Sequence, residues 1–391
     1  RTLRDTAAAD MAMVQALVRK TGEKGIVGDW GVRAGAIIDG EVKPALSRQI
    51  AVFEGQRPGA TEDAGAWKLP QGDKSYALAL RAFTTTDYSA QDIHDIGLQQ
   101  VAAIQAEIDT ILKGMGMAEG SVGERIKALS EDPQHLWPNT DDAKVELIGS
   151  LNQQMAELEP LLPRVFNTLP RARVEIRRVP PSIELGAPGG YYQAASLDGT
   201  RPGAYYINLS NTANWPKWGL PTLTYHEASP GHHFQITVAR EAGSLPIYRR
   251  VAGNSAFNEG WALYAERVAA DDLDVYAGNP LGRVGYLQSY LFRAVRLVVD
   301  TGLHHKRWSR DQAIRYMIEE CGEPPESAEK EIDRYCVSIG QACSYKLGQT
   351  VIARLRAEAE ARPGFDLKTF HDRVLLNGSV PLAVLEGLMR T

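Results

Sequence analysis

Residues 225–234, YHEASPGHHF, bring together side chains suited to binding a metal ion. His226, His232 and His233 supply imidazole nitrogens, and Glu227 directly follows the first histidine. In an H-E-x-x-H helix, two histidines one turn apart bind one zinc ion, and the adjacent glutamate activates the zinc-bound water for hydrolysis. The residue types therefore predict a hydrolytic site with Zn²⁺ as its cofactor.

The spacing of these histidines departs from H-E-x-x-H. On an unbroken helix, His232 would be rotated roughly 120° from His226, and His233 would lie about 10 Å further along the axis. Pro230 opposes helix continuation, and Gly231 tolerates unusual backbone dihedral angles. We therefore expect a break at these two residues that returns His232 to the first histidine as second ligand, with His233 as the alternative. A metal-free polar cluster at a helix end is the competing interpretation.

A third ligand is expected from NEGWALYAERV (258–268), which has helical periodicity. A His₂Glu zinc site takes a carboxylate from a second helix and leaves the fourth position to water, a role that fits Glu259. Glu266 lies two turns further along the same helix face, where it could orient a ligand histidine or itself bind the metal. For both glutamates, the alternative is an ordinary solvated helix face.

Four further residues are weaker candidates. A tetrahedral intermediate needs a hydrogen-bond donor for its oxyanion, and Tyr345 is the candidate for this catalytic role. Tyr335 is a candidate for substrate binding or for supporting the site. His305 could reach a cleft, or could interact with the C-terminal dipole of its helix. Arg201 could hold a substrate carboxylate beside a strand edge that pairs with an extended peptide, or could belong to a simple turn.

Hydrophobic periodicity predicts a mostly α (α+β) fold. A capping-box pattern at Ser89 and Asp92 begins a long amphipathic helix over 89–112. The segment around 220–243 reads as helical, interrupted at Pro230–Gly231. Further helices are expected at 141–162, 256–270, 282–299, 310–320, 326–337 and 341–361, and strands at 171–180 and 203–210.

The pattern also suggests how the chain is organised. Residues 1–85 are dense in Gly, Pro and Asp, so we expect irregular structure there, packed on the main body. Residues 86–391 have no linker or repeat that would divide them. They are expected to form one helical catalytic domain.

Composition excludes several classes of function. The 391 residues include 43 basic and 48 acidic side chains, a formal net charge of −5, which argues against nucleic acid as a partner. No apolar stretch is long enough for a membrane span, and the first residues lack the layout of a signal peptide, so a cytoplasmic location stays open. The sequence does not indicate an oligomeric state.

The motifs together resemble a known family. DGTRPGAYYIN, LTYHEASPGHHFQ, NEGWALYAE, VDTGLHHKRWSRDQAI, GQACSYKLGQ and FHDRVLLNGSVPLAVLE occur in the order seen in the bacterial DUF885 family, which is similar to the gluzincin metallopeptidases. The likeness extends from about Trp67 to Leu388. It implies a zincin-like body with a small sheet edging the cleft. It also implies that His226, His232 and Glu259 are zinc ligands and that Glu227 is the general base.

Family members are often exported and longer at the N-terminus. The resemblance thus implies a periplasmic or lipoprotein-like location, and a chain that corresponds to the C-terminal part of a longer protein. The first hypothesis for function is a zinc-dependent peptidase that acts on peptide substrates. The alternatives are a noncatalytic binding or scaffold domain with a degenerate metal site, and a zinc hydrolase of a non-peptide amide or ester.

Overall fold

The computed structural model describes residues 1–181, 183–184 and 187–390. Residue contacts divide the chain into two compact units. The first comprises Arg1–Glu62 and Pro180–Gly186, and the second comprises Asp63–Val179 and Ala187–Thr391. Every candidate residue named above belongs to the second unit.

The first unit is helical, which corrects the expectation of irregular structure over residues 1–85. Ala8, Met11, Val14 and Ile38 form a small core of its own. Glycines such as Gly31, Gly35 and Gly55 lie within short helices, where they interrupt the apolar pattern that would mark a helix. The helices are α1 (Thr2–Asp5), α2 (Ala12–Glu23), α3 (Trp30–Ile37) and α4 (Lys43–Gln56), with a π-helical turn at Ile38–Val42 between the last two.

The second unit is mostly helical, as the periodicity predicted. The predicted capping box is confirmed, because Ser89 and Asp92 each bond the backbone N–H of the other. The boundary between the units falls near residue 62 rather than 85, since the helix Gly72–Thr84 already belongs to the second unit.

The helices of the second unit are α5 (Gly72–Thr84), α6 (Ala90–Gly114), α7 (Val122–Glu131), α8 (Asp141–Leu158), α9 (Leu220–Glu227), α10 (His232–Glu241), α11 (Ile247–Val251), α12 (Ser255–Arg267), α13 (Pro280–His304), α14 (Arg310–Cys321), α15 (Pro325–Val337), α16 (Cys343–Glu360), α17 (Leu367–Leu375) and α18 (Leu382–Arg390).

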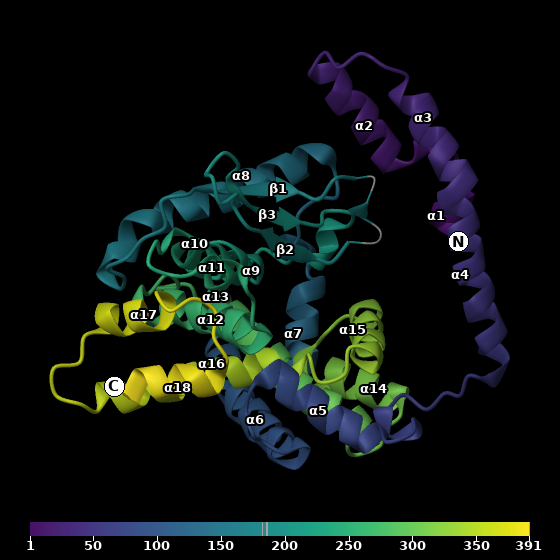
Figure 1. Cartoon of the computed structure of the whole chain (residues 1–391). Coiled ribbons are helices and arrows are strands. Elements are labelled where there is room, and N and C mark those ends of the chain that lie inside the picture. Colours follow the sequence, from purple (N-terminus) through teal and green to yellow (C-terminus); the bar gives the residue numbers. More distant parts are fainter. Residues whose placement is uncertain (182, 185–186, 391) are drawn as a thin grey trace. The chain divides into compact units, whose positions relative to one another are not determined.

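A three-stranded sheet lies beside the candidate site helices (Figure 1). The predicted strands are present as β1 (Val174–Arg178) and β3 (Gly203–Ile207), which run parallel. The strand β2 (Gly190–Gln193) was not predicted and pairs antiparallel with β3. Helix α8 covers one face of the sheet, where Ile176 and Tyr205 pack with apolar residues of the helix.

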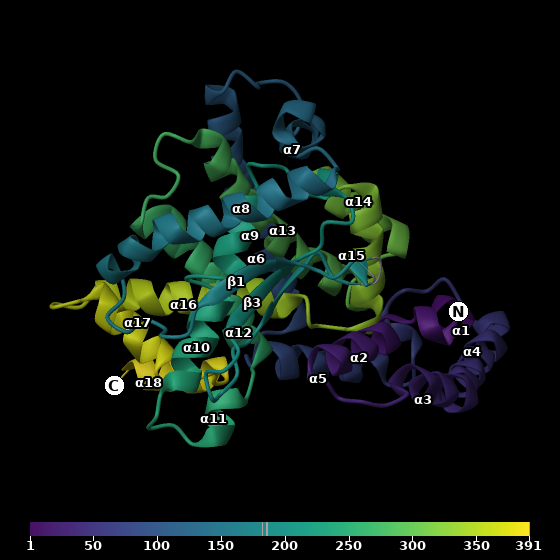
Figure 2. The ribbon, with the colours of Figure 1, turned by 90° about the horizontal axis from the view of Figure 1, so that it is seen from above.

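Four helices form the centre of the second unit (Figures 1 and 2). Helix α6 packs along α13, and α12 packs along α16. The second pair can approach closely because Gly260 and Gly348 face each other. A Cβ at Gly348 would lie 1.9 Å from the carbonyl oxygen of Ala256, which only glycine avoids. This contact places the helix that carries Glu259 against the helix that carries Tyr345.

No helix in the described part of the chain combines the length and the apolar character needed to cross a membrane.

Candidate metal centre

The predicted break between the histidines is present. Helix α9 ends at Glu227 and α10 begins at His232. At the break, the N–H of Gly231 bonds the carbonyl of Tyr225 at 3.0 Å. A Cβ on Gly231 would lie 1.9 Å from the carbonyl oxygen of His226, so this turn requires glycine. These contacts hold the start of α10 against the last turn of α9.

A hydrogen bond joins the third helix of the site, α12, to this break. The indole Nε1 of Trp261 donates a hydrogen bond to the carbonyl of Pro230 at 2.9 Å. Trp261 is fully buried on α12, two residues after Glu259. Because the side chain of Trp261 joins the break to α12, it helps to fix the position of Glu259 relative to the two histidines.

His226, His232 and Glu259 form one cluster. Their potential ligand atoms all lie within 4.8 Å of one another. Oε2 of Glu259 is 3.2 Å from Nε2 of His232 and 3.5 Å from Nε2 of His226. The side chain of His226 is 3% exposed, whereas those of His232 and Glu259 are 12% and 21% exposed. The cluster thus has one buried side and one side nearer to solvent.

Glu266 contacts His226 on the buried side of the cluster. Its Oε1 is 2.7 Å from Nδ1 of His226, and the glutamate is itself fully buried. Engagement of Nδ1 leaves Nε2 of His226 facing the other two residues. A carboxylate on the far nitrogen of a metal-binding histidine fixes the ring orientation and raises its basicity. Of the two roles considered for Glu266, its contact with Nδ1 corresponds to orientation of His226, and that role stays a prediction.

The charges of the cluster depend on one another. Burial disfavours the charged form of His226, but the carboxylates of Glu259 and Glu266 outweigh it and raise the pKa of the imidazole to about 9. Burial likewise disfavours the ionised form of Glu259, yet His232 and His226 hold the pKa of this carboxyl well below its usual range. The imidazoles and carboxylates of the cluster therefore stabilise each other's charged forms.

Glu227 and His232 each have an unpaired polar atom. Oε2 of Glu227 and Nδ1 of His232 are buried and have no hydrogen-bond partner among the described residues. Unpaired buried polar atoms are costly, and they concentrate where a ligand or water completes the structure. Both atoms belong to residues that the sequence assigns to metal chemistry.

His233 is engaged elsewhere. Its Nδ1 is 3.0 Å from the hydroxyl of Tyr192 on β2, and its Nε2 is 3.0 Å from the carbonyl oxygen of Ala172. Burial lowers the pKa of this imidazole to about 4, so it is neutral near pH 7. The structure thus brings His232, and not the alternative His233, to His226 and Glu259.

The other four candidates lie outside the cluster of three, one of them buried, one partly buried and two exposed. Tyr345 lies close enough to Glu259 that the carboxylate adds to burial in raising the pKa of the phenol. Tyr335 is fully buried and receives a hydrogen bond from Nε of Arg296 at 2.8 Å. Arg201 is exposed and donates to the carbonyl of Ala194 at 2.8 Å. His305 is exposed at the end of α13, and neither of these last two joins the cluster.

The family follows from comparison of the whole chain. A model described as "Bacterial protein of unknown function (DUF885)" matches residues 2–389. The chain belongs to the DUF885 family. A search of the curated proteins found no match to this DUF885 chain.

Two solved structures resemble this DUF885 chain, both described by the words "putative lipoprotein". The one from Colwellia psychrerythraea is 40% identical with a TM-score of 0.96, and the match covers 100% of this chain and 68% of that one. The one from Shewanella oneidensis is 21% identical with a TM-score of 0.71, and the match covers 96% and 69%. The second likeness shows the fold alone.

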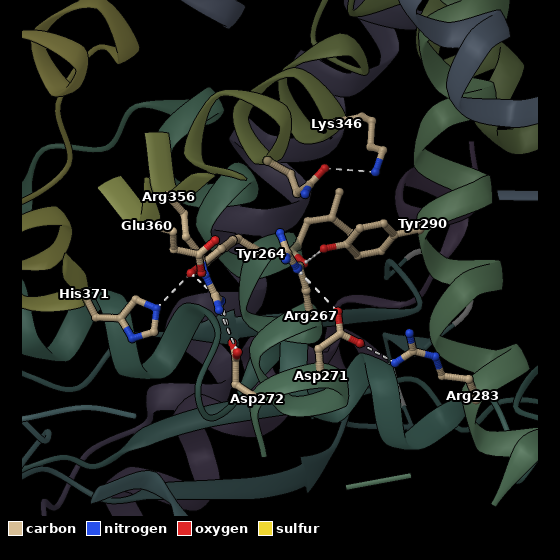
Figure 3. Close-up of polar contacts among 12 residues, drawn as sticks. Tyr264, Arg267, Asp271, Asp272, Arg283, Tyr290, Lys346, Arg356, Glu360 and His371 are labelled. Atoms are coloured by element: carbon tan, nitrogen blue, oxygen red, sulfur yellow. Dashed lines mark hydrogen bonds and ion pairs between the residues drawn. The ribbon is translucent and has the colours of Figure 1, made fainter. Parts of the chain in front are cut away.

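Nothing in the sequence indicated two charged residues near the cluster of His226, His232 and Glu259, namely Arg293 and Lys346. Arg293 on α13 lies near enough to His226 to oppose its protonation. Lys346 is buried, bonds Oε1 of Gln349 at 2.9 Å and stands 3.9 Å over the ring of Tyr290 (Figure 3). Burial lowers the pKa of its ammonium group to about 7. Charged residues at helical spacing look solvated in a sequence, so no signal marked Lys346 as buried or placed Arg293 near His226.

A second polar network supports α12 away from the cluster (Figure 3). The hydroxyl of Tyr264 is 2.9 Å from Nε2 of His371 and accepts a hydrogen bond from Arg356 at 3.1 Å. Both Nη atoms of Arg356 bond the carboxylate of Asp272, at 2.6 and 2.8 Å. This network ties the end of α12 to α16 and α17.

Proposed function

We propose that this protein is a zinc-dependent peptidase with a zincin-like, gluzincin-type body. The observation that carries the proposal is the convergence of His226, His232 and Glu259, whose potential ligand atoms lie within 4.8 Å of one another. Glu227 follows the first of these residues directly, as a general base does in H-E-x-x-H sites. The fold brings these residues together despite the unusual spacing of the histidines.

The residues fit zinc on chemical grounds. Two imidazole nitrogens and one carboxylate oxygen are the donors of a catalytic His₂Glu zinc site, which keeps a fourth position open. The bond of His226 to Glu266 is the support that such a ligand histidine needs. When bound, zinc would act as a Lewis acid that makes water nucleophilic near neutral pH.

The remaining chemistry falls to side chains of the chain itself. Glu227 accepts a proton from water as the water oxygen forms a bond to the peptide carbonyl carbon. Tyr345 donates a hydrogen bond to the oxygen that gains negative charge. Glu227 then delivers the proton to the amine nitrogen as the C–N bond breaks, so the protons balance. The products are one carboxylic acid and one amine, and transfer of the acid proton to the amine gives a carboxylate and an ammonium group.

The substrate class and location are proposals as well. We propose that the substrates are peptides, since the cluster has a solvent-facing side at His232 and Glu259. The solved relatives are described as lipoproteins, which supports a proposal that this chain is exported and acts outside the cytoplasm.

The deciding experiment combines metal analysis with a peptide library. We expect about one zinc per chain, cleavage of library peptides detected by mass spectrometry, and loss of cleavage after removal of zinc. His226→Ala is the metal-free control and Glu227→Gln the metal-retaining one. A folded protein that takes up no zinc favours a scaffold domain. A zinc-loaded protein that cleaves no peptide, but hydrolyses other amides or esters, favours the non-peptide hydrolase.

A further inference from the structure

Arg296 stands beside the proposed oxyanion donor. It lies on α13 with only 7% of its surface exposed. Its Cζ is 4.5 Å from the ring centroid of Tyr345 and 4.5 Å from that of Phe292. A guanidinium at such a distance from an aromatic ring is attracted to the ring face and restricts its movement. The side chain of Tyr345 thus has a fixed cation as a neighbour.

The guanidinium is itself held by two residues of α15. Nε donates to the hydroxyl of Tyr335 at 2.8 Å, and Nη2 donates to Oε2 of Glu331 at 2.9 Å. The same carboxylate oxygen accepts hydrogen bonds from Tyr335 and from Nη2 of Arg334. Two arginines and a tyrosine therefore converge on one carboxylate, which gives Arg296 little freedom to reorient.

The charges of this group are also fixed. Burial opposes the charged form of Arg296, but Tyr335 and Glu331 outweigh it and raise the pKa of the guanidinium above its usual range. Burial opposes ionisation of Glu331, but Arg296 and Arg334 lower the pKa of the carboxyl to about 2. Arg296 thus remains a cation, and Glu331 an anion, across the working pH range.

The charge of the candidate metal ligand Glu259 also acts on the phenol of Tyr345. The carboxylate of Glu259 adds to burial in disfavouring ionisation of the phenol, while Arg296 acts in the opposite direction. An oxyanion donor must stay protonated and must point in a fixed direction before the reaction begins. Burial and the charge of Glu259 keep the phenol protonated, and the guanidinium of Arg296, 4.5 Å from the ring centroid, restricts the ring.

We propose that Arg296 is a positioning residue that, anchored by Glu331 and Tyr335, holds the ring of Tyr345 on α16, the helix that packs against α12, so that its hydroxyl can serve the reaction. The proposal rests on the proposed peptidase function. Arginine suits this role better than lysine because its planar group can stack on a ring while its edge makes two directed hydrogen bonds. A lysine keeps the charge and loses that geometry.

A double-mutant cycle tests the proposal. Tyr345→Phe should lower kcat by ~10²-fold, as loss of one oxyanion donor does, with KM nearly unchanged. Arg296→Lys should lower kcat by about tenfold through misplacement of the phenol. The double variant should be no slower than Tyr345→Phe alone, because Arg296 acts through the hydroxyl. Losses that multiply in the double variant would overturn the proposal.

A second readout is independent of turnover. With 3-fluorotyrosine at position 345, the ¹⁹F signal reports ionisation of this phenol in the folded protein. Arg296→Gln removes the positive charge and should move the midpoint to higher pH. The matched control is Arg356→Lys, which alters another buried arginine near Tyr264 and should leave the midpoint in place. An unchanged midpoint in Arg296→Gln would contradict the proposal.

These readouts separate the two proposals. If the protein cleaves no peptide but the midpoint moves, the peptidase function fails and the coupling of Arg296 to Tyr345 stands. If peptides are cleaved and the midpoint does not move, the positioning role fails alone. Should the Arg296 variants not fold, Tyr335→Phe removes the hydroxyl that accepts from Nε and donates to Glu331, and it keeps Arg296 itself. It should then lower kcat in the wild-type background and have no effect in Tyr345→Phe.

Discussion

Glu266 and His226 form a buried pair in which Oε1 of the carboxylate lies 2.7 Å from Nδ1 of the ring. The contact fixes both the orientation of the imidazole and which nitrogen faces Glu259. A substitution of Glu266 would therefore change the orientation of His226. The architecture of the metal site therefore extends one residue beyond the three that would bind the ion.

Glu266→Gln should weaken zinc binding by ~10- to 100-fold, because the amide keeps the size of the side chain and loses the charge that supports His226. Competition with a metal chelator measures the affinity. Asp272→Asn is the control, since Asp272 is also a largely shielded carboxylate, 14% exposed, but pairs with Arg356. Equal affinities in Glu266→Gln and the wild type would show that the pair has only a packing role.

The two adjacent histidines should respond differently to substitution. His232→Ala should abolish tight zinc binding, because its Nε2 lies 3.2 Å from Glu259. His233→Ala should retain the metal and lose stability, since it leaves the carbonyl of Ala172 and the hydroxyl of Tyr192 without a partner. Zinc titration and thermal unfolding of both variants decide the matter. Loss of zinc in His233→Ala alone would reverse the assignment.

Glu227→Gln should keep zinc and lose activity by ~10²-fold or more, because an amide cannot take up the proton from water. Metal content and single-turnover rates on a cleaved library peptide are the measurements. Loss of the metal in this variant would instead make Glu227 a ligand, and the helix register described for α9 would then be wrong.

Gly231→Ala should disrupt the break between α9 and α10, because the new Cβ would lie 1.9 Å from the carbonyl oxygen of His226. We expect a loss of about 1–3 kcal/mol in the free energy of unfolding, together with weaker zinc binding. The control is Gly149→Ala, within helix α8, where a Cβ meets no atom within 4 Å. That change should stabilise the protein by up to about 1 kcal/mol.

The sequence could predict the cluster because its members are close in the chain or on one helix face. Pro230 and Gly231 marked the break, and the spacing from Glu259 to Glu266 placed two carboxylates two turns apart. The contact of Arg296 with Tyr345 joins distant helices, and no local pattern encodes it. The choice between His232 and His233 likewise depended on a tertiary contact, the bond of His233 to Tyr192 on an unpredicted strand.

Most of the helices were predicted because each buries one apolar stripe with period 3.6. Strand β2 (Gly190–Gln193) escaped notice because it has only four residues and begins with glycine. The helices of residues 1–62 escaped notice because many of their apolar side chains are exposed, such as Val32 and Phe53, which blurs the stripe. In both places, tertiary contacts override a weak local signal.

His371, the buried partner of Tyr264 in Figure 3, should make stability depend on pH. Burial lowers the pKa of the imidazole to about 4 in the folded protein; the nearby Arg356 also lowers it, while Asp272 and Asp372 oppose the shift. Because the unfolded chain binds the proton more readily, stability from the neutral ring is fully present above pH 6.5. It is lost as the pH falls toward 4.

We therefore expect wild type and His371→Gln to differ in their response to acid. Glutamine can bond the hydroxyl of Tyr264 and the carbonyl of Val165 as histidine does, but it does not titrate. Relative to this variant, the wild type should lose about 3 kcal/mol of unfolding free energy between pH 7 and pH 4. Denaturant unfolding in the presence of a chelator measures both. His233 titrates in both proteins, so its contribution cancels in the difference. A difference that does not change with pH would show that His371 takes up its proton equally well in the folded and unfolded chains.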